Sequence, residues 1–393
     1  MHIPAGFELT YCSNIHPAEG WPQVFDTLRR YAPELKRRLS PEAAFGLGLR
    51  LSNRESVELL QGTRLDEFRE FLRDAGLYVA LINGFPYGWF HERRLKDQVF
   101  APDWHSPERV DYTLRLVEIL RRLLPEGLDG GVSTCPLSYK PWFTQSSSAD
   151  WNLLIQNIVR VAERMFQAKA EHGRLIHLDI EPEPDGLVEN TSEFLQFFEQ
   201  LLRRGAPLLA QSAGLTLSAA EEGLREHVAL CFDLCHFAVE HEETSSTLAA
   251  IRAAGVRIGR VQVSSALKVA IPPGAPEREL LHDTLTSFID PVYLHQVIGT
   301  SERFADLPQG LACLTKTTAS EWRIHYHVPL FIQDYESLSS TQPDVKNALA
   351  QLTPAEVRHL EIETYTWGVL PPELKSDLVE SIEREYRWVL ANT

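Results

Sequence analysis

The feature that most constrains the fold of this chain is a regular alternation of short apolar segments with longer amphipathic ones. Eight short segments have the length and composition of strands, and a stretch with helical periodicity follows each of them. These segments are Phe7–Asn14, Phe45–Ser52, Leu77–Asn83, Gly130–Cys135, Leu175–Glu181, Val228–Asp233, Arg257–Ser264 and His359–Thr364. Eight strand–helix repeats are the pattern of a closed parallel barrel. We therefore expect an α/β fold, a (β/α)8 TIM barrel, in which residues 1–393 form a single domain.

Helix-start signals support this alternation. Ser106 is followed by Pro107, a capping residue before a proline in the first turn, and apolar residues then recur on one face. Asn190 and Glu193 form a capping-box pattern ahead of another apolar stripe. Both patterns predict helices that cover the outside of the barrel.

A ninth strand-like segment, Arg323–Phe331, does not fit the eightfold pattern. It lies in a stretch rich in Pro, Ser and Thr, approximately residues 266–353, which we interpret as an insertion after the seventh strand. Its residues His325 and His327 are two apart, so a strand would point both the same way. We predict that this strand crosses the barrel mouth and lends at least one histidine to the pocket. The alternative is that both lie on the surface of the insertion.

The composition narrows the possible partners. A formal net charge of −16 argues against nucleic acid, which needs a basic face. No stretch approaches the roughly 18 apolar residues of a membrane span, and no leader opens the chain. Five cysteines without paired spacing make a disulfide framework improbable. We expect a reduced, cytoplasmic protein that does not span a membrane.

Two late strands carry acidic residues on one face. In Ile176–Glu181 the polar face holds His177, Asp179 and Glu181, and His359–Glu363 alternates in the same way. Helices cover the outer face of a barrel strand, so the acidic face must point inward. Buried carboxylates are costly unless they are paired or bind a cation. The pattern indicates a metal or an acid–base pair at the C-terminal rim, although Arg, Gln and water could also satisfy a polar interior.

The sixth strand ends in Asp233-Leu234-Cys235-His236. An Asp at a strand end and a His three residues later can place an oxygen and an imidazole on one centre. The pattern alone is common. Its position after a strand, in register with Glu181 and Glu363, makes it more specific.

These strand ends resemble those of the xylose-isomerase-like superfamily, which contains sugar isomerases, sugar epimerases and nucleases of the AP endonuclease 2 type. Longer runs resemble the EboE proteins, called metabolite traffic proteins. These runs are LTYCSNIHP (9–17), HLDIEPEPDG (177–186), VQVSSAL (261–267), YLHQV (293–297), RIHYHVPLF (323–331) and HLEIETYTWGVLP (359–371).

The resemblance implies a divalent metal (Mn²⁺, Zn²⁺ or Mg²⁺) and a pair of glutamates that move a proton next to a carbonyl. The implied metal ligands are Glu181, Asp233, His236 and Glu363, and the implied catalytic residues are Glu181, Glu363 and His236. Gln262 stands where the superfamily has a histidine on the seventh strand. His295, His325 or His327 could replace it, and His327 is our candidate metal ligand. The candidate substrate-binding residues are Asn14, His16, Asn83, Gln262, His295, His325 and Trp367.

The leading function is therefore a metal-dependent isomerase or epimerase acting on a sugar, cyclitol or related polyol, in a pathway of metabolite synthesis or traffic. One alternative is a carrier that binds a metabolite without turnover. A second is a metal-dependent phosphoester hydrolase. The expected partner is a small sugar-like molecule, together with other proteins of the same pathway.

Overall fold

A computed structural model describes residues 1–393 except 91–94, 144–147, 336, 369 and 371–376. Its larger sheet contains eight parallel strands in the order β1-β14-β7-β6-β5-β4-β3-β2. The strands are β1 (Glu8–Tyr11), β2 (Phe45–Arg50), β3 (Leu77–Asn83), β4 (Gly130–Thr134), β5 (Ile176–Ile180), β6 (Val228–Asp233), β7 (Ile258–Val263) and β14 (His359–Ile362). Each lies inside or at the edge of a segment that the sequence predicted.

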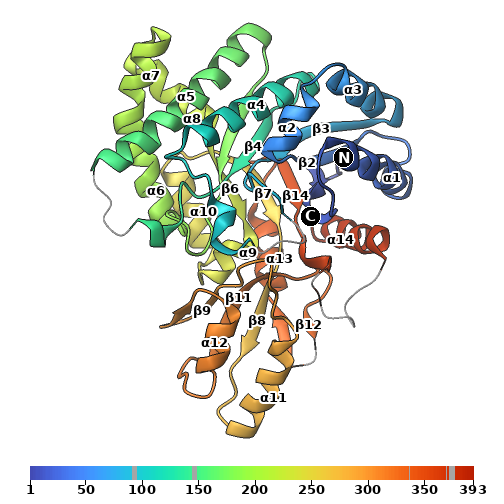
Figure 1. Cartoon of the computed structure of the whole chain (residues 1–393), viewed down its shortest axis with the longest axis vertical. Helices are drawn as coiled ribbons and strands as arrows, with labels where there is room; N and C mark the ends of the chain where they lie inside the picture. The colour runs from blue at the N-terminus through green and yellow to red at the C-terminus, as the bar shows by residue number, and fades with distance from the viewer. Residues whose placement is uncertain (91–94, 144–147, 336, 369, 371–376) are drawn as a thin grey trace.

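The sheet closes into a barrel. β1 pairs in parallel with β14, with Glu8 opposite His359. At the other seam, Cys12 and Gly48 form a parallel bridge that joins the end of β1 to β2. The predicted (β/α)8 barrel is therefore confirmed, and the upper part of Figure 1 shows it surrounded by its helices.

The helices of the outer layer begin at the predicted signals. Ser106 accepts a hydrogen bond from the backbone of Glu108 at the start of α4, and Asn190 accepts one from Glu193 at the start of α6. The layer contains α1 (Trp21–Leu39), α2 (Asn53–Leu59), α3 (Arg64–Ala75), α4 (Pro107–Leu123), α5 (Ser148–His172), α6 (Thr191–Gln200), α7 (Ala206–Ala213), α8 (Leu217–His227), α9 (Leu234–Val239), α10 (Thr244–Ala253), α13 (Gln342–Gln351) and α14 (Leu378–Asn392). Because α13 contacts α10 and α14, it fills the place of the helix between β7 and β14.

The insertion after β7 is richer in strands than the sequence predicted. It forms a six-stranded sheet in the order β10-β9-β11-β8-β13-β12, in which the pairs are antiparallel. The strands are β8 (Ala266–Ala270), β9 (Val297–Gly299), β10 (Arg303–Phe304), β11 (Glu321–His327), β12 (Asp334–Tyr335) and β13 (Leu338–Ser340). Four of the six have three residues or fewer, which is too short for an alternating pattern to be recognised. With α11 (Ala275–Thr286) and α12 (Leu307–Cys313), the sheet forms the lower lobe in Figure 1.

The predicted ninth strand corresponds to β11, which ends at His327 rather than at Phe331. Pro329 follows closely, and proline cannot donate a ladder hydrogen bond. β11 pairs with both β8 and β9, so it lies inside the inserted sheet rather than at its edge. The prediction that the whole chain is one domain stays a prediction.

The middle of the barrel contains an ion-pair network. The Arg260 guanidinium donates to Asp179 at 2.8 Å and to Glu361 at 2.9 Å, and all three side chains are fully buried. Glycines make room for it, because a Cβ on Gly259 would lie 2.0 Å from the Asp179 carboxylate. For Asp179 and Glu361, the inward-facing carboxylates are therefore neutralised by an arginine, which was the alternative to a bound metal.

No helix in the described part of the chain combines the length and the hydropathy that a bilayer span needs.

Candidate functional site

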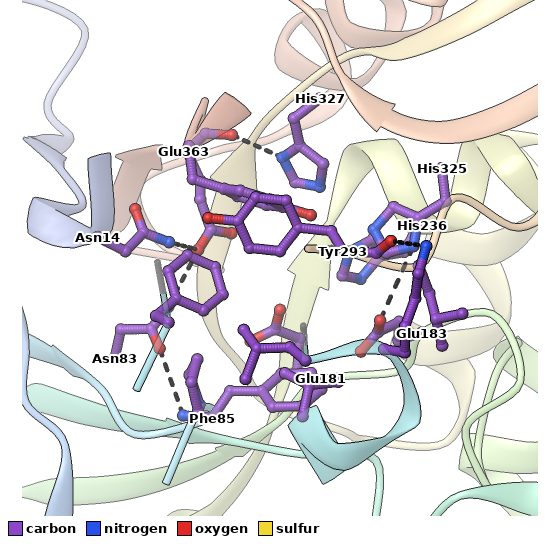
Figure 2. Close-up of a pocket in the computed structure, with 17 residues that line it drawn as sticks. Asn14, Asn83, Phe85, Glu181, Glu183, His236, Tyr293, His325, His327 and Glu363 are labelled. Carbon is purple, nitrogen blue, oxygen red and sulfur yellow. Dashed lines mark hydrogen bonds and ion pairs between the residues drawn. The ribbon is translucent and has the colours of Figure 1, made fainter. Parts of the chain in front are cut away.

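A pocket lies over the C-terminal ends of the barrel strands, with polar residues at its base (Figure 2). Asn14 follows β1, Asn83 ends β3, Glu181 follows β5 and Glu363 follows β14. Its cavity volume is about 50 Å³, which is room for a few small groups. The inserted sheet contributes to its wall, and the apolar side is formed by Phe85, Phe90, Leu95, Val99, Tyr293, Leu294 and Tyr365.

Three carboxylates form the centre of the site. Oxygen atoms of Glu181, Asp233 and Glu363 all lie within 4.8 Å of one another, and the three residues are at most 4% exposed. Burial raises the pKa of Glu181 well above its ordinary value, and the neighbouring Asp233 adds to this. Burial also raises the pKa of Glu363, followed by the effect of Glu181. Like charges this close favour a bound proton or a bound cation.

Amide groups hold Glu363 in place. The side-chain amides of Asn14 and Asn83 donate to the same Glu363 oxygen, at 2.8 and 3.0 Å. Asn83 is itself oriented, because its amide oxygen accepts from the backbone of Phe85 at 3.3 Å. Figure 2 shows both amides converging on Glu363. Two such bonds favour the charged form of Glu363.

Asp233 serves both the fold and the site. Its Oδ1 accepts from the backbone of His236 at 2.9 Å, which caps α9, and from the Ser264 hydroxyl at 2.8 Å. Its Oδ2 is buried without a hydrogen-bond partner among the described residues. The hydrogen bonds at the start of α9 therefore occupy Oδ1, whereas Oδ2 is available to a cation at the carboxylate cluster.

Two imidazoles complete the group. Nδ1 of His236 donates to the Pro182 carbonyl at 2.9 Å, and Nδ1 of His327 donates to the Glu363 carbonyl at 2.7 Å. Asp233, His236 and His327 each offer a ligand atom within 4.8 Å of the others. Burial lowers the pKa of His236 and lowers that of His327 to about 4, so both rings are neutral near pH 7. Their Nε2 lone pairs are therefore available.

These residues fit a divalent cation. Three buried carboxylates and two neutral imidazoles are the mixed oxygen and nitrogen donors that Mn²⁺ or Zn²⁺ accept. Among the described residues, Asp233 Oδ2 and His327 Nε2 have no hydrogen-bond partner, and a buried polar atom of this kind is costly. Both imidazoles are oriented through Nδ1 by a carbonyl, as metal-binding histidines usually are.

The structure brings the predicted metal and catalytic residues together, and it also places Asn14, Asn83 and His325 at the pocket. The other predicted substrate-binding residues do not line it. Gln262 lies beneath the cluster, where its amide donates to Glu181 at 3.4 Å. His16 stacks on Tyr31 and contacts the Tyr11 hydroxyl. 

His295 and Trp367 are also occupied elsewhere. His295 contacts the backbone carbonyl of His325 through Nδ1 and the Asp290 carboxylate through Nε2, so both ring nitrogens support the inserted segment. Trp367 is 7% exposed and stacks on Phe331. Sequence position after a strand could not distinguish these packing roles from pocket roles.

Sequence reasoning missed Glu183. This residue lines the pocket, is 6% exposed and lies 3.8 Å from the His325 ring. Burial raises its pKa well above the ordinary value. The only sequence signal was its position two residues after Glu181, in Glu181-Pro182-Glu183, on the same side of an extended segment.

Comparisons with known proteins concern the fold. No protein-family profile matches the chain, and no curated protein is similar to it in sequence. Similar solved structures include the probable 3-DHS dehydratase AsbF, involved in petrobactin synthesis, from Bacillus anthracis, at 11% identity and a TM-score of 0.48 over 97% of this chain and 98% of that one. The IolI protein with a binding zinc atom is 13% identical, with a TM-score of 0.45 over 98% of this chain and 97% of its own. 

A xylose isomerase domain containing protein from Salmonella typhimurium is 13% identical, with a TM-score of 0.43 over 100% of this chain and 98% of its own. The resemblance to the EboE proteins stays a prediction.

Proposed function

We propose that this protein is a metal-dependent isomerase or epimerase that acts on a sugar, cyclitol or related polyol. The observation that carries the proposal is the buried cluster of Glu181, Asp233 and Glu363 at the base of a pocket. Two glutamates beside one cation site are the groups needed to remove a proton from a carbon next to a carbonyl and to return it.

The residues that would hold the metal are Glu181, Asp233 and Glu363, with an imidazole from His236 or His327. A divalent ion bound there would polarise the substrate carbonyl and stabilise the negative charge that develops on its oxygen. His236 also lines the pocket, where its Nε2 lone pair can instead accept a hydrogen bond from a substrate hydroxyl.

The different surroundings of the two glutamates support different roles for them. Glu363 accepts two amide hydrogen bonds that favour its charged form, so it is the general base. Among the described residues, the side chain of Glu181 receives only long contacts, from Gln262 at 3.4 Å and from the Cys231 thiol at 3.7 Å. Glu181 therefore holds a proton more readily than Glu363 does, and we assign it the role of general acid.

The lining of the pocket favours an uncharged ligand. Lys96 contributes a stem to the wall, but its ammonium group donates to the backbone carbonyls of Asp290 and Tyr293 and to the Asp306 carboxylate. This cation is therefore engaged and does not face a substrate phosphate, which argues against the phosphoester hydrolase. The polar base and apolar wall suit a hydroxyl-rich molecule with one apolar edge.

The experiment that tests this function is exchange of solvent deuterium into candidate sugars and into the ketones of candidate polyols. The reaction runs in heavy water with Mn²⁺, and NMR follows after a chelator has removed the metal. We expect exchange in the wild type and a loss of about 10²–10⁴-fold in Glu363→Gln. Glu70→Gln, on the exposed surface of α3, is the matched control. Tight binding without exchange would instead support the metabolite carrier. The pathway partners and the cytoplasmic location stay predictions.

A further inference from the structure

A second group of metal-ligand side chains lies where the barrel meets the inserted sheet. Cys235 comes from α9, and His325 and His327 come from β11. Each offers one ligand atom, and these atoms lie within 4.8 Å of one another. The three residues are at most 3% exposed, so water does not solvate their polar atoms freely. The pattern that predicted two histidines at the pocket did not include the cysteine.

Hydrogen bonds orient both imidazoles toward this group. Nδ1 of His325 donates to the Gln296 amide oxygen at 2.8 Å, and the Gln296 nitrogen is fixed by the Pro184 carbonyl at 3.0 Å. Nδ1 of His327 donates to the Glu363 carbonyl. Each ring therefore carries its hydrogen on Nδ1 and a lone pair on Nε2. Neither Nε2 has a hydrogen-bond partner among the described residues.

Ordinary packing explains only part of this arrangement. Cys235 belongs to a small apolar cluster with Val239, Ala266 and Ile298, so its thiol could be a simple core group. Apolar packing does not explain the two buried imidazole lone pairs beside Cys235. A buried nitrogen atom without a hydrogen-bond partner costs free energy. A bound cation would satisfy both nitrogens and the sulfur at once.

The surroundings also favour a cation. Glu183 lies 3.8 Å from the His325 ring, and the Asp233 carboxylate offers an oxygen within 4.8 Å of a His327 ligand atom. Figure 2 shows His325, His236 and Glu183 together on one side of the pocket, with His327 above. Two nitrogens and a sulfur are softer donors than the carboxylate cluster, and they suit Zn²⁺ rather than Mg²⁺.

We propose that Cys235, His325 and His327 form a second cation site, selective for Zn²⁺ or a similar borderline ion. A tetrahedral zinc ion holds its sulfur and nitrogen ligands roughly 3.5 Å apart. The three ligand atoms lie within 4.8 Å of one another, so they need to approach by at most roughly 1.3 Å. Binding displaces the thiol proton to solvent. The Nε2 of His327 can serve one ion, so His236 supplies the imidazole to the carboxylate cluster. Asp233 lies between the two sites.

This site does not depend on the isomerase proposal, since it involves none of the groups assigned to proton transfer. Together the two proposals predict two ions of different character. A harder ion binds at Glu181, Asp233 and Glu363, and a softer ion binds at Cys235, His325 and His327. The two predictions can fail separately.

The test is Co²⁺ titration of the full-length protein, stripped of metal beforehand with a chelator. A thiolate bound to Co²⁺ gives a charge-transfer band in the near ultraviolet, which carboxylates and imidazoles do not give. We expect the band in the wild type, its loss in Cys235→Ser, and at least tenfold weaker Co²⁺ binding at this site in His325→Ala. Zn²⁺ should displace the cobalt and abolish the band, whereas Mg²⁺ should not.

The controls separate this site from folding and from the carboxylate cluster. Cys313→Ser and His282→Ala change a cysteine and an exposed histidine elsewhere in the insertion, and both should keep the band. Glu181→Gln should also keep it while it loses the harder ion. Circular dichroism of each metal-free variant checks the fold. A wild type without the band, or a band that persists in Cys235→Ser, would overturn the proposal and leave the isomerase proposal standing.

Discussion

The His327 ring donates from Nδ1 to the backbone carbonyl of Glu363 at 2.7 Å, which links the inserted sheet to the last strand of the barrel. A carbonyl can only accept, so the bond also fixes the tautomer of the ring. The ring then offers its Nε2 lone pair to two groups of ligand atoms, one with Asp233 and His236 and one with Cys235 and His325. The insertion thus brings an imidazole to the site while the seventh strand carries Gln262.

The amides that hold Glu363 should matter for metal affinity. We expect Asn83→Ala to weaken Mn²⁺ binding by about 10–100-fold, because Glu363 loses a donor that orients it. Isothermal titration calorimetry measures the change. Asn152→Ala is the control, since this asparagine contacts Arg204 on the exposed surface. Wild-type affinity in Asn83→Ala would show that the amide does not position the ligand.

The interior ion-pair network should dominate stability. Arg260→Met removes the partner of two buried carboxylates, Asp179 and Glu361. We expect a loss of about 3–5 kcal/mol in the free energy of unfolding, measured by urea denaturation. Arg387→Ala breaks an exposed pair with Glu383 and should cost less than about 1 kcal/mol. Equal losses of unfolding free energy in Arg260→Met and Arg387→Ala would show that the buried ion pairs contribute no more than the exposed one.

Glu385 should make stability depend on pH. Burial raises its pKa from 4.5 to about 8, although Thr364 donates to it at 2.6 Å. A folded-state pKa above the unfolded value gives stability that is full below pH 4.5 and is lost as the pH rises through about 8. Glu385→Gln stays neutral, so relative to the wild type it should gain more than about 2 kcal/mol between pH 5 and pH 9.

Glu383 on the same helix is the matched control for this pH effect. A hydrogen bond from Arg387 lowers the pKa of Glu383, so the sign is opposite and Glu383→Gln should show no such gain. Urea denaturation of both variants at the two pH values provides the measurement. A Glu385→Gln curve parallel to the wild type would mean that this carboxyl is charged in the folded protein.

The barrel and much of the candidate site could be predicted because both follow from strand periodicity. Alternation placed Glu181 and Glu363 inside the barrel, and strand ends placed Asp233 beside them. Pairing across the barrel could not be predicted, so the role of Arg260 in neutralising Asp179 and Glu361 was missed. 

The insertion shows the same limit. Strands as short as Arg303–Phe304 carry no periodic signal and form only because neighbouring strands pair with them. The sequence also could not predict the direction of side chains outside regular strands. His295 and His325 could both have faced the pocket, and only the contacts with Asp290 and Gln296 distinguish them.

The most direct test of the central claim is anomalous scattering from crystals soaked with Mn²⁺. We expect one strong manganese peak bound by oxygens of Glu181, Asp233 and Glu363, and its loss from crystals of Glu181→Gln. Glu70→Gln crystals should keep the peak. Wild-type crystals with no manganese at this cluster, or a peak there that Glu181→Gln leaves unchanged, would contradict the account.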